Sequence, residues 1–94
     1  MKIRATLHLS EQSRTLDLNG RLGWAVTQLA EAGPKGVTPI TRPAPRWSGY
    51  VFDLRELGVP IETIMEPHEG SYPGMHARYV LTCEAEISLL DWEV

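Results

Sequence analysis

The segment that most constrains the fold is GVTPITRPA, residues 36–44, in which Pro39 and Pro43 stand close together. Proline lacks a backbone N–H and clashes with the preceding helical turn, so prolines at this density prevent a regular helix longer than about one turn. A short strand or a single turn over residues 37–41 is the structure that fits. This connector therefore separates the elements that precede it from those that follow it.

Apolar residues recur at helical spacing on both sides of the connector. Before it, the spacing predicts an amphipathic helix over residues 20–32, with Asn19 as the N-cap and Gly33 ending the helix. After it, the spacing predicts a helix over residues 45–57, which begins on a proline and is closed by Gly58. The apolar positions are Leu22, Ala25, Val26 and Leu29 in the first helix and Trp47, Tyr50, Val51, Leu54 and Leu57 in the second. Each helix is therefore expected to bury one face and expose the other.

Alternation of polar and apolar residues predicts two β-hairpins. At the N-terminus, residues 2–9 and 15–18 alternate in this way around a polar turn. After the second helix, residues 59–66 and 76–82 have strand character and flank a tip punctuated by glycine and proline. The order of elements is therefore hairpin, helix, connector, helix, hairpin, which indicates an α+β fold.

The last eleven residues, 84–94, combine four carboxylates, a charge of −4, with large apolar side chains. Their pattern fits a helix and a strand equally well, so two interpretations stay open. In one, Ile87, Leu89 and Leu90 complete a sheet and the acidic side chains face water. In the other, Trp92 fills an apolar groove and the carboxylates lie toward Arg42 and Arg46, which precede and begin the second helix, where they screen the positive charge of that face.

A chain of 94 residues has the length of one domain. We expect a single domain over residues 1–83, with a hairpin in 1–19 and the remaining elements in 20–83, followed by the tail 84–94. One cysteine excludes an intramolecular disulfide and a cysteine-rich zinc site. The N-terminus alternates polar and apolar residues where a signal peptide has a continuous apolar stretch, and no run of 18 apolar residues occurs. These features predict a cytoplasmic protein that is not embedded in a membrane.

Neither a metal site nor a catalytic site is expected. His68, His76 and Cys83 are spaced by eight and seven residues, which matches no compact zinc pattern, and a fourth ligand such as His8 would come from a distant strand. No serine or cysteine has a histidine at a diagnostic spacing, and no phosphate-binding glycine loop occurs. The sequence therefore predicts a protein that is not an enzyme and needs no cofactor.

Four pieces of the sequence carry a resemblance to a known family: GVTPI, PRWSGYVFDLRELG, IETI and HARYVL. Through them, residues 20–81 resemble a group of small bacterial and phage winged helix-turn-helix proteins, most of them of unassigned function. The resemblance implies an α+β winged helix-turn-helix, here with an additional N-terminal β-hairpin. It also implies binding of double-stranded DNA by a transcriptional or phage-type regulator, with residues 45–57 as the recognition helix and 59–82 as the wing.

The predicted DNA-binding surface combines the second helix with the wing. Its residues are Arg42, Arg46, Ser48 and Arg55 around the helix and His68, Tyr72, His76 and Arg78 in the wing. The first residues of a recognition helix reach base edges in the major groove, and a wing bearing tyrosine and arginine can follow a phosphate backbone. The alternative is that Arg42 and Arg46 are solvated or pair with carboxylates such as Glu62 or Glu66, and that the wing tip is an ordinary surface loop.

A second function also stays open, a protein-interaction module on a winged-helix scaffold that has lost DNA binding. Asp53 and Glu56 fall on the exposed side of the second helix, where they would repel phosphate, and the net charge is −3. Phe52 falls outside the buried stripe, and Phe52 and Trp92 are the candidate partner-binding residues. A homodimer is expected for the DNA-binding protein, because one small module buries too little surface for tight specific binding.

Overall fold

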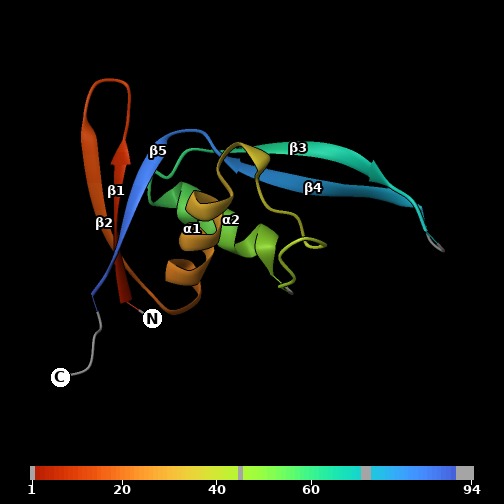
Figure 1. The fold of residues 1–94 in the computed structure, drawn as a ribbon, viewed down its shortest axis with the longest axis horizontal. Coiled ribbons are helices and arrows are strands. Elements are labelled where there is room, and N and C mark those ends of the chain that lie inside the picture. Colours follow the sequence, from red (N-terminus) through yellow and green to blue (C-terminus); the bar gives the residue numbers. More distant parts are fainter. Residues whose placement is uncertain (1, 45, 71–72, 91–94) are drawn as a thin grey trace.

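The computed structural model describes residues 2–44, 46–70 and 73–90 and has an α+β fold (Figure 1). The elements are β1 (Lys2–His8), β2 (Ser13–Asn19), α1 (Gly20–Ala32), the 3-10 helix η1 (Gly33–Lys35), α2 (Trp47–Glu56), β3 (Ile61–His68), β4 (Gly74–Leu81) and β5 (Glu84–Leu89). The strands form a three-stranded sheet and a separate two-stranded hairpin, with the helices between them (Figure 1). No helix in the described part of the chain is long and apolar enough to span a membrane.

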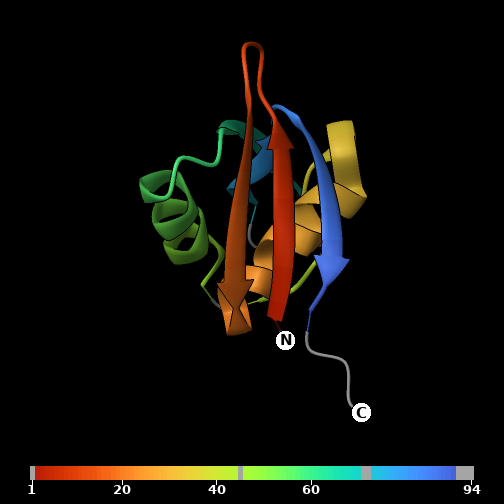
Figure 2. The same ribbon diagram turned by 90° about the vertical axis from the view of Figure 1, so that its left-hand side faces the viewer.

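The three-stranded sheet has the order β2-β1-β5 and is antiparallel throughout. The predicted N-terminal hairpin is confirmed, because β1 pairs with β2 along seven residues on each strand. Alternation along β1 places Ile3, Ala5 and Leu7 on one face, and all three are buried. That face covers the helices, and Figure 2 shows the sheet in front with α1 and α2 behind it.

The third strand of this sheet comes from the segment that the sequence analysis set apart as a tail. Residues 84–89 form β5, which pairs with the free edge of β1 and places Ile87 opposite Ala5. The folded unit therefore continues past the boundary expected at Cys83, because β5 forms the backbone hydrogen bonds along the edge of β1 that β2 leaves open. Sequence periodicity could not decide this, since the deciding contacts come from the other end of the chain. Trp92 lies outside the described residues.

Both predicted helices are present, the first with its predicted limits and the second shorter than expected. Helix α1 covers 20–32 and ends where Gly33 adopts φ 58°, although the side chain of Asn19 makes no capping hydrogen bond. Helix α2 covers 47–56 instead of 45–57. It starts late because the backbone of Arg46, at φ −136° and ψ 36°, is not helical. Gly58, at φ 92°, follows the last turn as predicted.

The proline-containing connector contains no helix over residues 36–44, in agreement with the sequence. Val37 forms an isolated bridge with Tyr79 of β4 through two backbone hydrogen bonds of 2.8 Å, and Thr38 then organises a single turn. The hydroxyl of Thr38 accepts the backbone N–H of Thr41 at 3.0 Å. Gly36 makes the close approach possible, because a Cβ at this left-handed position would lie 2.6 Å from the carbonyl oxygen of Tyr79. The connector is thereby tied to the base of the hairpin.

An aromatic cluster joins the helices to the β3–β4 hairpin. The ring of Trp47 lies 5.4 Å from Trp24 of α1 and 6.4 Å from Tyr79 of β4, measured between centroids. Its indole N–H donates to the carbonyl oxygen of Arg42 at 2.7 Å, so the connector is bound to the same side chain. Trp47 is only 2% exposed. One residue of α2 therefore fixes the helix against α1, the connector and the base of the hairpin.

Candidate nucleic-acid interface

The exposed start of α2 carries a cation and a hydroxyl group. Helix α2 buries Trp47, Tyr50, Val51 and Leu54 against the body of the domain, so the remaining positions face outward. Arg46 and Ser48 are exposed at its first turn, and the guanidinium of Arg46 lies across Gly49, where a Cβ would be 3.5 Å from Nη2. Arg46 makes no ion pair with any residue that the structure describes. This end of the helix can therefore present a positive charge to a ligand.

Arg42, predicted to lie beside Arg46, is turned toward α1. Its Nη1 donates to the side-chain oxygen of Gln28, and it also lies 3.5 Å from a carboxylate oxygen of Glu31. The carboxylate is thus on α1 and not at either position considered from the sequence, Glu62 or Glu66. Because the side chains of Arg42 and Glu31 are 37% and 58% exposed, this ion pair is weak and can be exchanged for another anion.

Arg55, at the other end of α2, is bound to the base of the hairpin. Its Nη2 donates to the carbonyl oxygen of Ile61 at 2.8 Å and to the hydroxyl of Thr63 at 2.7 Å, and its Nε also reaches the Ile61 carbonyl, at 3.2 Å. These neutral acceptors leave the positive charge uncompensated. Arg55 therefore links α2 to β3 and still contributes a positive field at this edge.

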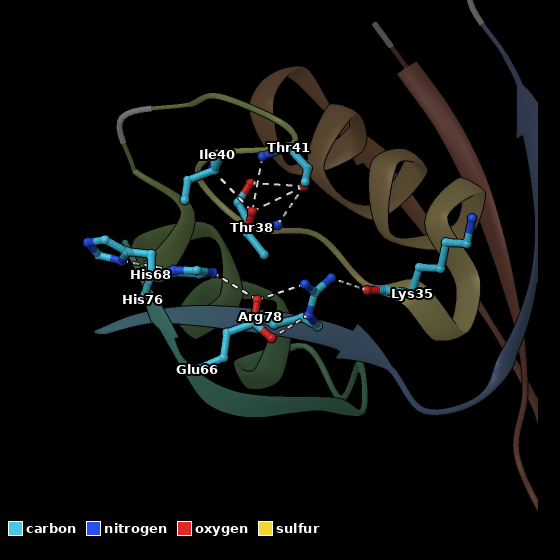
Figure 3. A network of polar contacts seen from close by, with 8 residues as sticks. All are labelled: Lys35, Thr38, Ile40, Thr41, Glu66, His68, His76 and Arg78. Atoms are coloured by element: carbon cyan, nitrogen blue, oxygen red, sulfur yellow. Dashed lines mark hydrogen bonds and ion pairs between the residues drawn. The ribbon is translucent and has the colours of Figure 1, made fainter. Parts of the chain in front are cut away.

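The predicted wing residues form a chain of polar contacts along the hairpin (Figure 3). Arg78 donates from Nε and Nη2 to the two carboxylate oxygens of Glu66, at 3.0 and 2.7 Å. His76 lies 2.8 Å from the same carboxylate through Nε2, and its Nδ1 lies 3.0 Å from Nδ1 of His68. Arg78 also donates from Nη1 to the carbonyl oxygen of Lys35 at 2.5 Å. Glu66 is therefore the centre of the chain.

The acceptors in this chain fix where its protons lie. An ionised carboxylate only accepts hydrogen bonds, so Nε2 of His76 carries a hydrogen. In the neutral ring Nδ1 of His76 is then an acceptor, and Nδ1 of His68 is the donor.

The network shifts the proton affinity of its charged groups. Hydrogen bonds from Arg78 and then from His76 lower the pKa of Glu66 below its ordinary value of 4.5, and Glu66 raises the pKa of Arg78. A carboxylate with a lowered pKa stabilises the folded state above its unfolded pKa, and this contribution disappears as the pH falls through its folded pKa. Glu66 is thus held as an anion at neutral pH.

Residues 15–91 match the family model described as the winged helix domain. The chain belongs to the winged helix domain family. No curated protein and no solved structure gives a significant match to it. In the winged helix domain described here, α2 is the second α-helix, the connector before it forms a single turn at Thr38, and β3–β4 is the hairpin predicted to be the wing.

In this winged helix domain the predicted DNA-binding residues lie on both faces of the β3–β4 hairpin. In an antiparallel hairpin, directly paired residues share a face, so Arg78 and His76 lie on one face with their partners Ile64 and Glu66. Thr63 pairs with Tyr79 on the other face, where Arg55 binds. Arg78 and His76 therefore lie on the face of the hairpin opposite to the face that α2 contacts. Tyr72 lies outside the described residues.

Sequence reasoning did not identify Glu66 as the residue that binds Arg78 and His76. It named Glu66 only as a possible partner of Arg42 and Arg46. The signal that would have found it is the strand register, because Glu66 is paired directly with His76 and diagonally with Arg78. Register is set by the whole hairpin and is not visible in the spacing of two residues.

The remaining titratable residues do not assemble into a metal site in the described part of the chain, which contains no group of three or more suitable ligands. His8 instead lies 2.6 Å from a carboxylate oxygen of Glu86 across the β1–β5 pair. Cys83 is half-buried as a free cysteine, and burial raises the pKa of its thiol. Its thiolate form is therefore disfavoured at neutral pH.

Proposed function

We propose that this winged helix domain binds double-stranded DNA as a cytoplasmic transcriptional or phage-type regulator. The observation that carries the proposal is the pairing of an exposed α2 N-terminus, bearing Arg46 and Ser48, with a hairpin that projects from the domain (Figure 1). Residues at the start of a recognition helix contact base edges, and arginine can bind guanine with two hydrogen bonds. The role proposed is binding without catalysis, and it needs no cofactor.

The dimensions of these elements suit a duplex. The ten residues of α2 extend about 15 Å, and a helix fits the major groove, which is about 12 Å wide. The eight residues of β3 extend about 26 Å, so the wing reaches an adjacent groove. A wing inside a groove has a phosphate backbone on each side, so cations on both of its faces can contribute. We propose a homodimer for operator binding, because one helix and one wing bury little surface.

Replacing Arg46 with alanine is expected to weaken duplex binding by about 1–3 kcal/mol if Arg46 contacts a base. If Arg46 contacts only a phosphate, the slope of log K against log salt should flatten by about one unit instead. Fluorescence anisotropy with a labelled duplex at several salt concentrations measures both quantities.

The matched control is Arg4→Ala, which removes the same charge from the outer face of the three-stranded sheet. Arg4 pairs there with Asp17 through half-exposed side chains, so the fold should tolerate its loss. Equal effects of Arg46→Ala and Arg4→Ala on duplex affinity would show that only the net charge matters and that the start of α2 does not contact the DNA.

A second candidate function, a protein-interaction module, is favoured by the outward side of α2. Phe52 is 64% exposed there, and Asp53 and Glu56 beside it are also exposed. An exposed aromatic residue among carboxylates fits a partner with an apolar pocket and a basic rim. Phe52→Ala should abolish binding to such a partner while leaving affinity for duplex DNA unchanged. If Phe52→Ala weakens DNA binding as strongly as Arg46→Ala, α2 uses one surface for DNA and this second function loses its support.

A further inference from the structure

Three N–H groups of the wing converge on a single anion. They are Nε and Nη2 of Arg78 and Nε2 of His76, and their distances to the carboxylate oxygens of Glu66 are 3.0, 2.7 and 2.8 Å (Figure 3). The fork of an arginine side chain binds carboxylate and phosphate with the same paired geometry. The donor set that holds Glu66 is therefore equally suited to a phosphate group.

We propose that Arg78 and His76 form a phosphate-binding site on the wing, which Glu66 occupies in the free protein and which a backbone phosphate of DNA takes in the complex. The proposal rests on the DNA-binding function proposed above. Glu66 is then an internal competitor of DNA, and it lowers affinity without touching the duplex.

The donors keep their positions without Glu66, because each has a second support. Arg78 is bound through Nη1 to the carbonyl oxygen of Lys35, and its side chain packs at Gly36, where an added Cβ would be 3.1 Å from Cγ of Arg78. His76 is held through Nδ1 by His68. When the carboxylate leaves, the side chains of Arg78 and His76 therefore stay in place. The site is preorganised for the incoming anion.

Exchange of the carboxylate for a phosphate is physically accessible. The side chains of Arg78 and Glu66 are 30% and 28% exposed, so water and ligands reach the ion pair. An ion pair at the surface contributes little to stability, so breaking it costs little free energy. A phosphate that is neutralised by a cation releases counterions from DNA, and this release favours the exchange. Lys35 of η1 contacts Arg78 through its backbone carbonyl oxygen, while its side chain points away from Glu66 (Figure 3).

The test compares Glu66→Gln with Glu62→Gln in the full chain. Glu62 lies on the same strand and the same face as Glu66, is exposed, and makes no ion pair among the described residues. Both variants therefore remove one negative charge from the same face of the wing, but only Glu66→Gln replaces the anion in the site with a neutral group. Anisotropy titrations with one labelled duplex at about 50–200 mM salt measure affinity and salt slope.

Glu66→Gln is expected to bind the duplex about three- to fivefold more tightly than Glu62→Gln. This factor corresponds to the free energy of one surface ion pair, which DNA no longer has to break. Its salt slope should be steeper by about one unit, since one more phosphate is neutralised. Equal affinities and slopes for the two variants would overturn the proposal. Weaker binding by Glu66→Gln would also overturn it, because Glu66 would then be a support that the wing needs.

A second readout separates this site from the function of the whole protein. If wild type and both variants fail to bind duplex DNA, the proposed function fails, and the site is tested with inorganic phosphate alone. In NMR spectra of Glu66→Gln, saturable shifts of the Arg78 Nε–H signal and the His76 ring signals would support the site. Absence of these shifts, or identical shifts in Glu62→Gln, would overturn it.

Discussion

Replacing Trp47 with alanine should lower the free energy of unfolding by about 3–5 kcal/mol, the range for truncating a large buried aromatic side chain. Trp47 is 2% exposed and contacts the rings of Trp24, Tyr50 and Tyr79. Its loss also leaves the carbonyl oxygen of Arg42 without its 2.7 Å donor. Urea unfolding followed by circular dichroism measures the change.

Two variants show whether the effect comes from packing at this position. Phe52→Ala removes an aromatic ring from the same helix at a site that is 64% exposed, and its effect should stay within about 0.5 kcal/mol. Trp47→Phe keeps most of the ring contacts but loses the indole N–H, and it should cost about 1–2 kcal/mol. A loss below about 1 kcal/mol in Trp47→Ala would contradict the packing described here.

Truncation after Cys83 should prevent the chain from folding. It removes β5, the second partner of β1, and uncovers the buried residues Ile3, Ala5 and Leu7 along that edge. A domain of this size has a stability of only about 5–10 kcal/mol, so the loss of a whole strand takes most of it. Circular dichroism and size-exclusion chromatography of the truncated chain should show an unfolded or aggregated protein.

The matched control removes charge and keeps the strand. The double variant Glu84→Gln/Glu86→Gln neutralises the two carboxylates of β5, which are exposed, and it should fold normally. A truncated chain that unfolds cooperatively near the wild-type midpoint would contradict the assignment of β5 as a structural strand. It would instead favour a tail that acts through its charge.

The elements that the sequence predicted best are those whose signals are local. Helix α1 has four apolar residues at helical spacing and a glycine at its end, and its limits agree with the prediction. The start of α2 was misplaced by two residues, because the backbone of Arg46 is not helical. The absence of a helix between the two prolines followed directly from proline chemistry.

The features that the sequence could not predict depend on distant partners. The segment 84–89 suits both a helix and a strand, and pairing with β1, almost eighty residues earlier, decides between them. Arg42 was predicted to lie beside Arg46, but its side chain is turned toward α1, where its carboxylate partner Glu31 lies. Arg78 was predicted as a DNA contact on the wing, and the sequence did not show that the strand register brings Glu66 onto it. Local patterns therefore identify candidate cations but not their internal partners.

Direct titration of the wild-type chain with a labelled random-sequence duplex tests the central claim, that this winged helix domain binds DNA. At about 50 mM salt we expect a dissociation constant on the order of 10⁻⁶ M. Binding should weaken by more than about tenfold between 50 and 200 mM salt, which corresponds to two or more phosphate contacts. No binding at 50 mM salt by a protein shown to be folded would contradict the claim and leave the exposed face of α2 around Phe52 as the functional surface.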